Sequence, residues 1–275
     1  MVISDRCEVE KAYAKLNLYL DVLSKREDGF HNIVGIFQTI DLCDLLEFQL
    51  IDNPFGIEIE SNVPIEGQNL IEKAFVIVYQ HYRVDFGLKV KLTKKIPIGS
   101  GLGGGSSDAA AALRFFSRKL KIPKDEILFM AQKVGSDVPF LIDGGTALVE
   151  GRGERITHLE PITAYSVNLF CSKTAISTKS AYSMLTADDF DRGPKPIERL
   201  YDAYKDHDIE SIRSFSYNVF QKTICSLYPE ISTNLKNAWA ENPIVAMMTG
   251  TGSCIFSVHN HGGEYTFNAG SWKVQ

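Results

Sequence analysis

Long apolar runs are missing from this chain of 275 residues. The longest clearly apolar run extends only from Ala74 to Tyr79, whereas a membrane-spanning helix needs about 20 such residues. The segment Met1–Glu8 has neither an apolar core nor a cleavage pattern, so we expect no secretory signal. These absences favour a soluble protein of the cytoplasm.

Cysteine is scarce as well, and its spacing is uninformative. The five cysteines are an odd number and form no Cys-x-x-Cys pair: Cys7, Cys43, Cys171, Cys225 and Cys254. This pattern is not that of a disulfide framework or a zinc site. We therefore expect reduced, mostly buried thiols.

An excess of basic charge is also lacking. Lys and Arg number 29 against 34 Asp and Glu, which gives a formal net charge of −5. This balance, with no basic block, argues against nucleic acid or an anionic membrane surface as a partner. An anionic small molecule stays possible only where hydrogen-bond donors are concentrated locally.

What the sequence does contain is an ordinary globular composition, with 44% hydrophobic residues and mixed periodicity. Strands are predicted over residues 13–22, 33–40, 45–50, 57–60, 88–92, 138–142, 146–150, 167–171, 244–247 and 254–258. Helices are predicted over 70–82, from 108 onward, and over 124–134, 178–185, 196–205 and 230–241. Strict βαβ alternation is absent, so we expect an α+β fold of two sub-domains, with Asp188–Pro196 as a loop between halves.

A glycine-rich segment follows the strand predicted at 88–92. Residues 99 to 105 hold five glycines in seven positions, and glycine is needed where the backbone adopts positive φ or approaches a ligand closely. The backbone N–H groups of such a turn, together with the following helix N-terminus, bind anions. Ser106 and Ser107 add hydroxyl donors. The segment therefore predicts a phosphate site.

Several known phosphate motifs compete for this segment. Gly99-x-Gly101-x-x-Gly104 matches the dinucleotide fingerprint of NAD enzymes, but residues 94–97 separate it from the preceding strand. A Walker loop would end in Gly-Lys-Ser/Thr, and a protein-kinase loop would be followed by His-Arg-Asp and Asp-Phe-Gly; neither pattern follows here. A merely flexible turn is disfavoured by the well-defined helix immediately after it.

A fourth interpretation fits better, because three separate segments match one family. The strings Pro97–Ala110, Ala14–Leu18 and Met248–Ser253 resemble the three motifs of the GHMP kinases, which include galactokinase, homoserine kinase and mevalonate kinase. The resemblance implies an N-terminal half over residues 1–160 that is similar to domain 2 of ribosomal protein S5 and carries the ATP loop. It implies a ferredoxin-like C-terminal half over residues 161–275.

Finer features narrow the resemblance. The segments Ala14–Leu18, Arg26–His31 and Gly135–Pro139, with the Gly-Gly-Gly-Ser-Ser form of the loop, resemble the members whose acceptor alcohol carries a cytidyl diphosphate. This implies ATP with Mg²⁺ as cosubstrate, the 2-hydroxyl of a methylerythritol unit as acceptor, and a step of the non-mevalonate isoprenoid pathway. The alternative is another small-molecule kinase of the superfamily, similar to homoserine or mevalonate kinase.

Two residues are candidates for the chemistry. An alcohol kinase needs a group that accepts the hydroxyl proton and cations that offset phosphoryl charge. By resemblance Asp137 is the base, and Lys15 pairs with it and faces the reacting hydroxyl. The residues alone leave alternatives open: Asp137 caps a turn or helix, and Lys15 extends from a strand edge to solvent.

The acceptor site is assigned by resemblance too. Phe30 stacks on the cytosine, His31 bonds its edge, and Tyr182 supplies a second aromatic ring on the other side of the base. On the residues alone, an exposed aromatic next to a His usually belongs to an ordinary loop, and the segment Ser177–Leu185 also fits a plain helix. Asn17 shares a strand face with Lys15 and is expected to bind substrate hydroxyls. Thr251, in the third motif, completes the substrate set.

The ATP site is assigned to the loop and two flanking residues. The assigned residues are Pro97, Ile98, Gly99, Ser100, Gly101, Leu102, Gly103, Gly104, Gly105, Ser106, Ser107, Asn69 and Lys94. Asn69 also fits as the N-cap of a helix with Glu72 three residues on. Metal ligands stay unspecified, since no carboxylate cluster marks a site, although Ser107 and the nearby Asp108 suit Mg²⁺. The tail from Asn260 resembles the family less.

Overall fold

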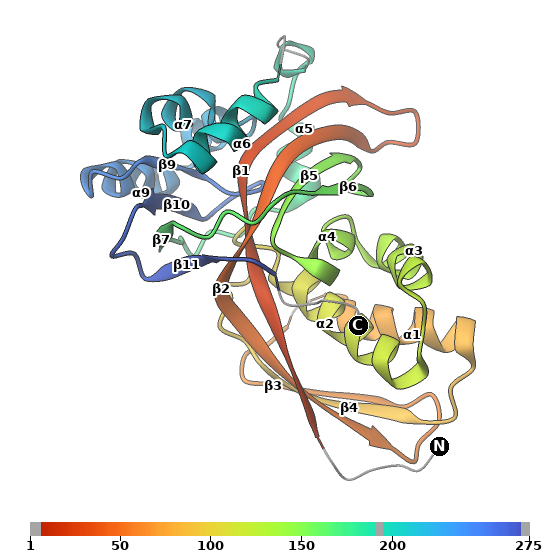
Figure 1. The fold of residues 1–275 in the computed structure, drawn as a ribbon. Helices are drawn as coiled ribbons and strands as arrows, with labels where there is room; N and C mark the ends of the chain where they lie inside the picture. The colour runs from red at the N-terminus through yellow and green to blue at the C-terminus, as the bar shows by residue number, and fades with distance from the viewer. Residues whose placement is uncertain (1–6, 66, 191–194, 271–275) are drawn as a thin grey trace.

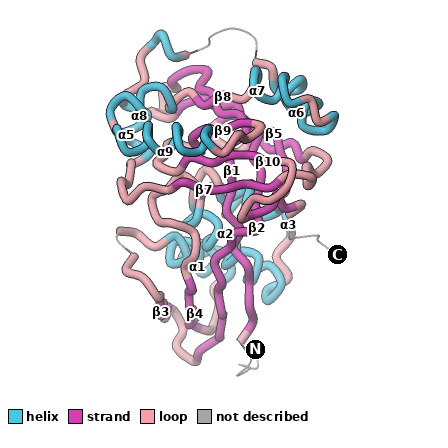
Figure 2. Tube along the Cα trace, turned by 90° about the vertical axis from the view of Figure 1, so that its left-hand side faces the viewer, coloured by secondary structure: helices cyan, strands magenta, loops and turns pink. Residues whose placement is uncertain are grey.

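A long antiparallel hairpin forms the centre of the computed structural model, which describes residues 7–65, 67–190 and 195–270. Strand β1 (Glu8–Lys25) pairs with β2 (His31–Ile51) along most of their length. The two apolar runs expected at 33–40 and 45–50 are continuous in β2. Burial alternates along its second half but is complete over residues 33–40, because both faces of the sheet are covered there (Figures 1 and 2).

The N-terminal half is built on this hairpin. β3 (Ile57–Ser61) runs parallel to β4 (Gly87–Thr93), β4 pairs with β2, and β5 (Thr146–Gly151) pairs with the other end of β2 and with β6 (Arg155–His158). Four helices cover one face of the sheet (Figure 1): α1 (Leu70–Tyr82), α2 (Gly104–Leu120), α3 (Lys124–Val134) and α4 (Val138–Asp143). Residues 109–112 of α2 are alanines with no exposed surface, which lets this helix lie close to the sheet.

The C-terminal half has its own antiparallel strands, β7 (Ser166–Phe170), β10 (Ile255–His259) and β9 (Val245–Met248). A short strand, β8 (Tyr217–Asn218), runs parallel to β1. The helices of this half are α5 (Thr178–Ser183), α6 (Ile197–Asp206), α7 (Ile209–Phe215), α8 (Gln221–Leu227) and α9 (Pro229–Ala240), with a 3₁₀ turn at Ala187–Asp189. Part of the loop expected at 188–196 lies outside the described residues.

The C-terminal tail joins the two halves. Strand β11 (Tyr265–Asn268) pairs with β7 on one side and with β2 on the other. The Gln38 amide and the Thr39 hydroxyl both donate to the carbonyl of Asn268. This strand, the short helices α7 and α8, and β6 had no strong periodic signal in the sequence.

The strand expected over Val138–Ile142 is wrong, since the segment forms helix α4. Pro139 occupies the first turn of the helix, where its missing N–H is not needed. A short apolar run cannot be assigned by periodicity alone, and a proline there should have argued against a central strand.

The expectation of reduced thiols is wrong for one pair, because Cys171 and Cys254 form a disulfide. The β7–β10 register places Phe170 opposite Ile255, so the two cysteines just beyond face each other with a Cα–Cα distance of 4.1 Å. A sequence separation of 83 residues gave no local signal of this pairing. Of the free thiols, Cys7 is exposed, and Cys43 and Cys225 are partly buried.

Reduction of this disulfide is expected to lower the free energy of unfolding by about 2–4 kcal/mol, because it releases a long closed loop in the unfolded chain. Denaturant unfolding with and without dithiothreitol measures the change. The variant with Cys171→Ala and Cys254→Ala serves as control and should not respond to the reductant. An equal response of both proteins would contradict the prediction.

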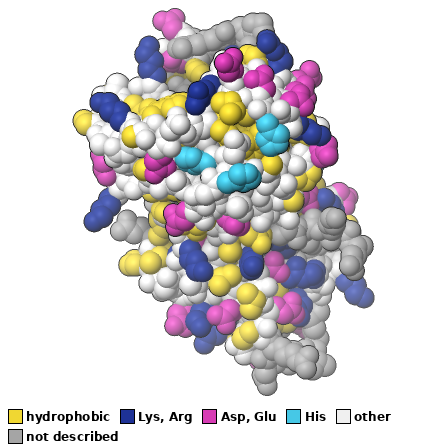
Figure 3. Space-filling view, turned by 60° about the vertical axis from the view of Figure 1, so that its left-hand side comes forward, with side chains coloured by type: hydrophobic (Ala, Val, Ile, Leu, Met, Phe, Trp, Pro, Cys, Tyr) yellow, Lys and Arg dark blue, Asp and Glu magenta, His cyan; other side chains and the backbone are white. Residues whose placement is uncertain are grey.

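The surface carries charges of both signs. Figure 3 shows Lys and Arg side chains interspersed with Asp and Glu over the face it presents, without a patch of one sign. Among the described residues, no helix has both the length and the apolar character needed to cross a membrane.

Candidate active site

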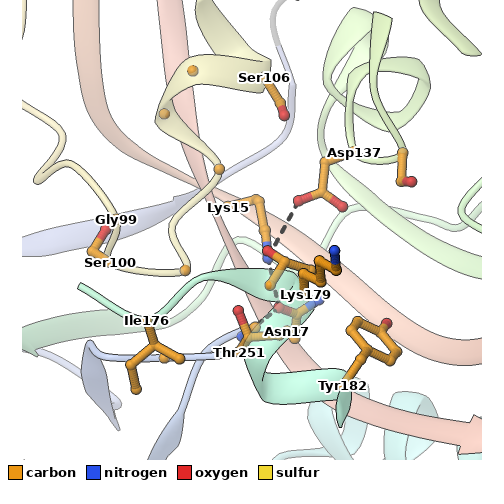
Figure 4. A pocket seen from close by; sticks show the side chains of 18 of the residues that line it. Lys15, Asn17, Gly99, Ser100, Ser106, Asp137, Ile176, Lys179, Tyr182 and Thr251 are labelled. Atoms are coloured by element: carbon orange, nitrogen blue, oxygen red, sulfur yellow. Dashed lines mark hydrogen bonds and ion pairs between the residues drawn. The ribbon is translucent and has the colours of Figure 1, made fainter. Parts of the chain in front are cut away.

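A cavity of about 1040 Å³ opens between the two halves. Its walls come from β1 and the β1–β2 turn, the start of α1, the glycine-rich segment, the start of α4, helix α5 and the loop at residues 250–252. The cavity thus collects segments that are far apart in the sequence, and among them are the three motifs that resemble those of the GHMP kinases (Figure 4).

The glycine-rich segment forms the wall of one end of the cavity. Gly99, Gly101 and Gly103 all have positive φ, and Gly103 is the N-cap of α2, which begins earlier than expected, at Gly104. A Cβ on Gly101 would lie 2.3 Å from the carbonyl oxygen of Thr249. The glycines therefore let the turn pack directly on the third motif, and the free N–H groups at the start of α2 face the cavity as an anion site.

Not all the residues assigned to ATP line the cavity. The Leu102 side chain is fully buried, and its carbonyl accepts from the Lys15 N–H at 2.9 Å. The Ser107 hydroxyl donates to the Tyr13 carbonyl at 2.7 Å and is buried. Both residues fasten the loop and α2 to β1, so the expected contact of the Ser107 side chain with phosphate or metal is not supported. The other assigned residues line the cavity.

Lys15 and Asp137 meet at the middle of the cavity. The Lys15 Nζ lies 3.6 Å from Asp137 Oδ2, with 4% and 30% of the two side chains exposed. Burial lowers the pKa of Lys15, and the Asp137 carboxylate opposes this shift. Asp137 is the N-cap residue of α4 but makes no side-chain cap bond, so its carboxylate faces Lys15 rather than the helix (Figure 4).

Asn17 connects this pair to the third motif. Its Oδ1 accepts from the Lys15 ammonium at 2.7 Å and from the Gly250 N–H at 2.8 Å. Asn218, which the sequence did not single out, donates to the carbonyls of Met248 and Gly250, each at 2.8 Å. The catalytic candidates are therefore held against a loop from the other end of the chain.

Lys94 forms a buried cluster of ion pairs beneath the glycine-rich segment. Its ammonium lies 2.5 Å from Asp44 and 2.8 Å from Asp108, and all three side chains are buried. Burial disfavours the charged form of Lys94, but the two carboxylates outweigh this effect of burial and raise the pKa of Lys94. Asp44 also accepts from the N–H groups of Lys95 and Ile96. Since Asp44 and Asp108 are distant in sequence, this cluster was not foreseen.

Asn69 acts as the N-cap of α1, since its side chain accepts from the Ile71 N–H at 2.9 Å. It also lines the cavity. The two interpretations offered by the sequence are therefore compatible at this position.

Aromatic rings line the opposite end of the cavity. The His31 ring lies 4.7 Å from the Tyr182 ring between centroids, and 5.9 Å from that of Phe190. Burial and then the Lys25 ammonium lower the pKa of His31, which favours the neutral imidazole. Phe30 is half exposed, with 50% of its surface accessible.

Phe30 and Tyr182, the two rings expected on either side of the cytosine, both line the cavity but have different neighbours. Tyr182 contacts His31, whereas Phe30 lies under the Arg152 guanidinium at 4.9 Å. Phe190 and Arg152 line the cavity without having been singled out, because single aromatic or basic residues outside a motif carry no sequence signal.

The described residues contain no group of three or more His, Cys, Asp or Glu side chains that could hold a metal ion. Mg²⁺ needs less than that, because it takes one or two protein oxygens and completes its shell with phosphates and water. The Ser106 side chain and Asp108 both line the cavity, and Asp108 Oδ1 is buried without a hydrogen-bond partner. The residues present therefore fit a magnesium ion beside the glycine loop.

Comparison with known proteins agrees with this geometry. The family model for the GHMP kinases N terminal domain matches residues 69–145. A solved homoserine kinase from Cytophaga hutchinsonii superposes with a TM-score of 0.69 at 18% identity, covering 94% of this chain and 87% of the other. The fold is that of the GHMP kinases, a mixed α and β architecture, as the three motifs predicted.

More similar proteins define the family. A protein of Pseudothermotoga lettingae named 4-diphosphocytidyl-2-C-methyl-D-erythritol kinase is 58% identical over 97% of both chains. A crystal structure of 4-(cytidine 5′-diphospho)-2C-methyl-D-erythritol kinase superposes with a TM-score of 0.78 at 28% identity, covering 91% of this chain and 89% of the other. The chain belongs to the 4-diphosphocytidyl-2-C-methyl-D-erythritol kinase family, which confirms the finer resemblance.

Proposed function

We propose that this protein transfers the γ-phosphoryl group of ATP to the 2-hydroxyl of 4-diphosphocytidyl-2-C-methyl-D-erythritol, a step in the non-mevalonate route to isoprenoid precursors. The observation that carries the proposal is the Lys15–Asp137 pair, which lies in the same cavity as the glycine-rich phosphate loop. Family membership supplies the identity of the acceptor.

In this mechanism the oxygen of the acceptor hydroxyl attacks the γ-phosphorus of ATP, Asp137 accepts the hydroxyl proton, and the bond from the γ-phosphorus to the β,γ-bridging oxygen breaks to release ADP. The 30% exposure of Asp137 leaves room for a substrate hydroxyl, and its carboxylate faces the Lys15 ammonium at 3.6 Å. Lys15 also stabilises the negative charge on the transferring oxygens. Asn17 orients Lys15 through its hydrogen bond, and transfer is direct, without a phosphoenzyme.

The glycine-rich segment holds the ATP phosphates on the N–H groups at the start of α2, with the Ser106 hydroxyl as a further donor. Ser106 and Asp108 are the residues that would hold Mg²⁺, which supplies charge neutralisation for the phosphate oxygens. Asn69 and the Lys94 stem border the nucleoside. The tight packing of the loop on Thr249 keeps these donors in place before ATP arrives.

The aromatic end receives the cytosine. The neutral His31 imidazole has one donor and one acceptor for the edge of a base, while Phe30 and Tyr182 offer ring faces. Thr251, which lines the cavity, faces the methylerythritol unit. A substrate of this length fits a cavity that has a phosphate loop at one end and aromatic rings at the other.

We extend the proposal to domain organisation and location. Residues 1–160 correspond to the domain similar to ribosomal protein S5 domain 2, and residues 161–275 to the ferredoxin-like domain. The compartment is the cytoplasm, where ATP is available. The partners are the two small-molecule substrates, without nucleic acid or membrane.

The test is a comparison of acceptors. ADP release is measured with ATP, Mg²⁺ and either 4-diphosphocytidyl-2-C-methyl-D-erythritol, homoserine or mevalonate. We expect turnover with the cytidyl substrate, and a kcat/KM at least about 1,000-fold lower with the other two, because a site built for a base and a diphosphate loses those contacts. Turnover only with homoserine or mevalonate would overturn the proposed acceptor.

A further inference from the structure

The cations of the cavity differ in what they contact. The basic side chains that line it are Lys15, Lys25, Lys94, Arg152 and Lys179. Lys15 pairs with Asp137, Lys94 is held by two carboxylates, and Arg152 lies over Phe30. Neither Lys25 nor Lys179 forms an ion pair with a carboxylate of the described residues. Lys25 lies opposite His31 in the β1–β2 hairpin, whereas Lys179 lies on helix α5. An ammonium without a partner in a substrate cavity suits an anionic group of a ligand.

The position of Lys179 is fixed by helix α5. Ser177 caps this helix by accepting from the Ser180 N–H, and the buried Ile176 anchors the segment just before it. Lys179 and Tyr182 are three residues apart and so share one side of the helix. Both line the cavity, and Figure 4 shows Lys179 between the Lys15–Asn17 pair and Tyr182.

Tyr182 is itself close to the reaction centre. Burial raises its pKa, and the nearby Asp137 carboxylate raises it further. The distance from the aromatic end to the Lys15–Asp137 pair is therefore bridged by a single face of α5. A ligand that contacts both ends has this face of α5 beside it, because both Lys179 and Tyr182 line the cavity.

We infer that Lys179 binds the diphosphate that links the cytidyl group to the sugar alcohol. This inference rests on the proposed function, which places the base at the aromatic rings and the alcohol at Lys15 and Asp137. The linking diphosphate, with two negative charges, then passes Lys179. The triphosphate of ATP has its own donors at the glycine loop, on the other side of Lys15.

The test is Lys179→Met, which removes the charge and keeps most of the stem at an exposed helix position. We expect KM for the cytidyl acceptor to rise about 10- to 100-fold, the value of a charge-assisted contact, with KM for ATP changed less than about twofold. Lys179→Arg should restore most of the affinity. Lys236→Met, on an exposed position of α9 outside the cavity, is the control and should resemble the wild type.

Direct binding gives a second readout without turnover. Calorimetry compares cytidine 5′-diphosphate with cytidine as probes. We expect Lys179→Met to weaken binding of the diphosphate about tenfold or more and to leave cytidine unchanged.

Two outcomes would overturn the assignment of Lys179. One is an unchanged KM for the acceptor in Lys179→Met together with unchanged binding of cytidine 5′-diphosphate. The other is a raised KM for ATP or a lowered kcat with the acceptor KM unaffected, which would place the ammonium on the γ-phosphate. A wild-type protein that phosphorylates a different alcohol but not the cytidyl substrate would instead overturn the proposed function.

Discussion

Asp137→Asn is expected to lower kcat by about 10³-fold, since proton transfer by a positioned side chain contributes roughly 10²- to 10⁴-fold. Asparagine keeps the shape of the side chain but cannot accept the hydroxyl proton. The change also removes the charge that faces Lys15 at 3.6 Å, so the pKa of the buried ammonium falls further. Both effects act on the transition state more than on ATP binding.

Steady-state kinetics with both substrates measure this effect. The KM for ATP should stay within about twofold of the wild-type value, because the N–H groups of the glycine-rich segment that bind the phosphates are unchanged. Asp143→Asn is a matched control at the other end of the same helix α4, where the carboxylate pairs with Lys124 and His158 and does not line the cavity. An unaltered kcat in Asp137→Asn would remove this residue from the role of base.

Gly101→Ala is expected to have the second large effect, a loss of about 2–4 kcal/mol in the free energy of unfolding. Gly101 has φ of 81°, which disfavours any side chain. Its Cβ would also lie 2.3 Å from the Thr249 carbonyl oxygen and 3.1 Å from that of Gly252, and backbone on both sides leaves no room to yield. The glycine-rich segment must then move away from the third motif, Met248–Ser253.

Thermal unfolding and ATP binding together test this prediction, with KM for ATP expected to rise about tenfold or more as the donor geometry is lost. Gly105→Ala is the control for stability. Gly105 lies in the first turn of α2, and the nearest atom to its Cβ would be Leu70 Cδ1 at 3.9 Å. The control should be as stable as the wild type or more so. Equal destabilisation of the two variants would contradict the packing argument.

Local patterns were enough to predict much of the fold. Strand β1, helix α1 with its Asn69 cap and helix α3 follow from period and capping, which are properties of neighbouring residues. Helix α4 did not follow, because an apolar run of its length is compatible with either structure. Strand β11 depends on partners in β2 and β7, so its own residues carry little signal.

The residues of the candidate site differ in the same respect: some belong to local motifs, and others depend on partners that are distant in the sequence. The glycine loop and its neighbours Lys15 and Asn17 belong to motifs, so the sequence pointed to them before any geometry was known. The Lys94 cluster and the Cys171–Cys254 disulfide depend on residues far apart in the chain. Lys179 is a single lysine on a short helix. Its position in the substrate cavity follows from the placement of α5 and not from its sequence neighbours.

Strand β11 has a consequence for how substrates enter and products leave. Because this strand is hydrogen-bonded to both sheets, a wide hinge opening between the halves would have to break a ladder and the Gln38 and Thr39 contacts with Asn268. Motion during turnover should therefore be confined to the rim of the cavity, where α5 and the β1–β2 turn carry the proposed acceptor contacts. A bulky partner or tag attached directly after β11 would strain the hydrogen bonds by which this strand links β7 to β2 and so holds the two halves together.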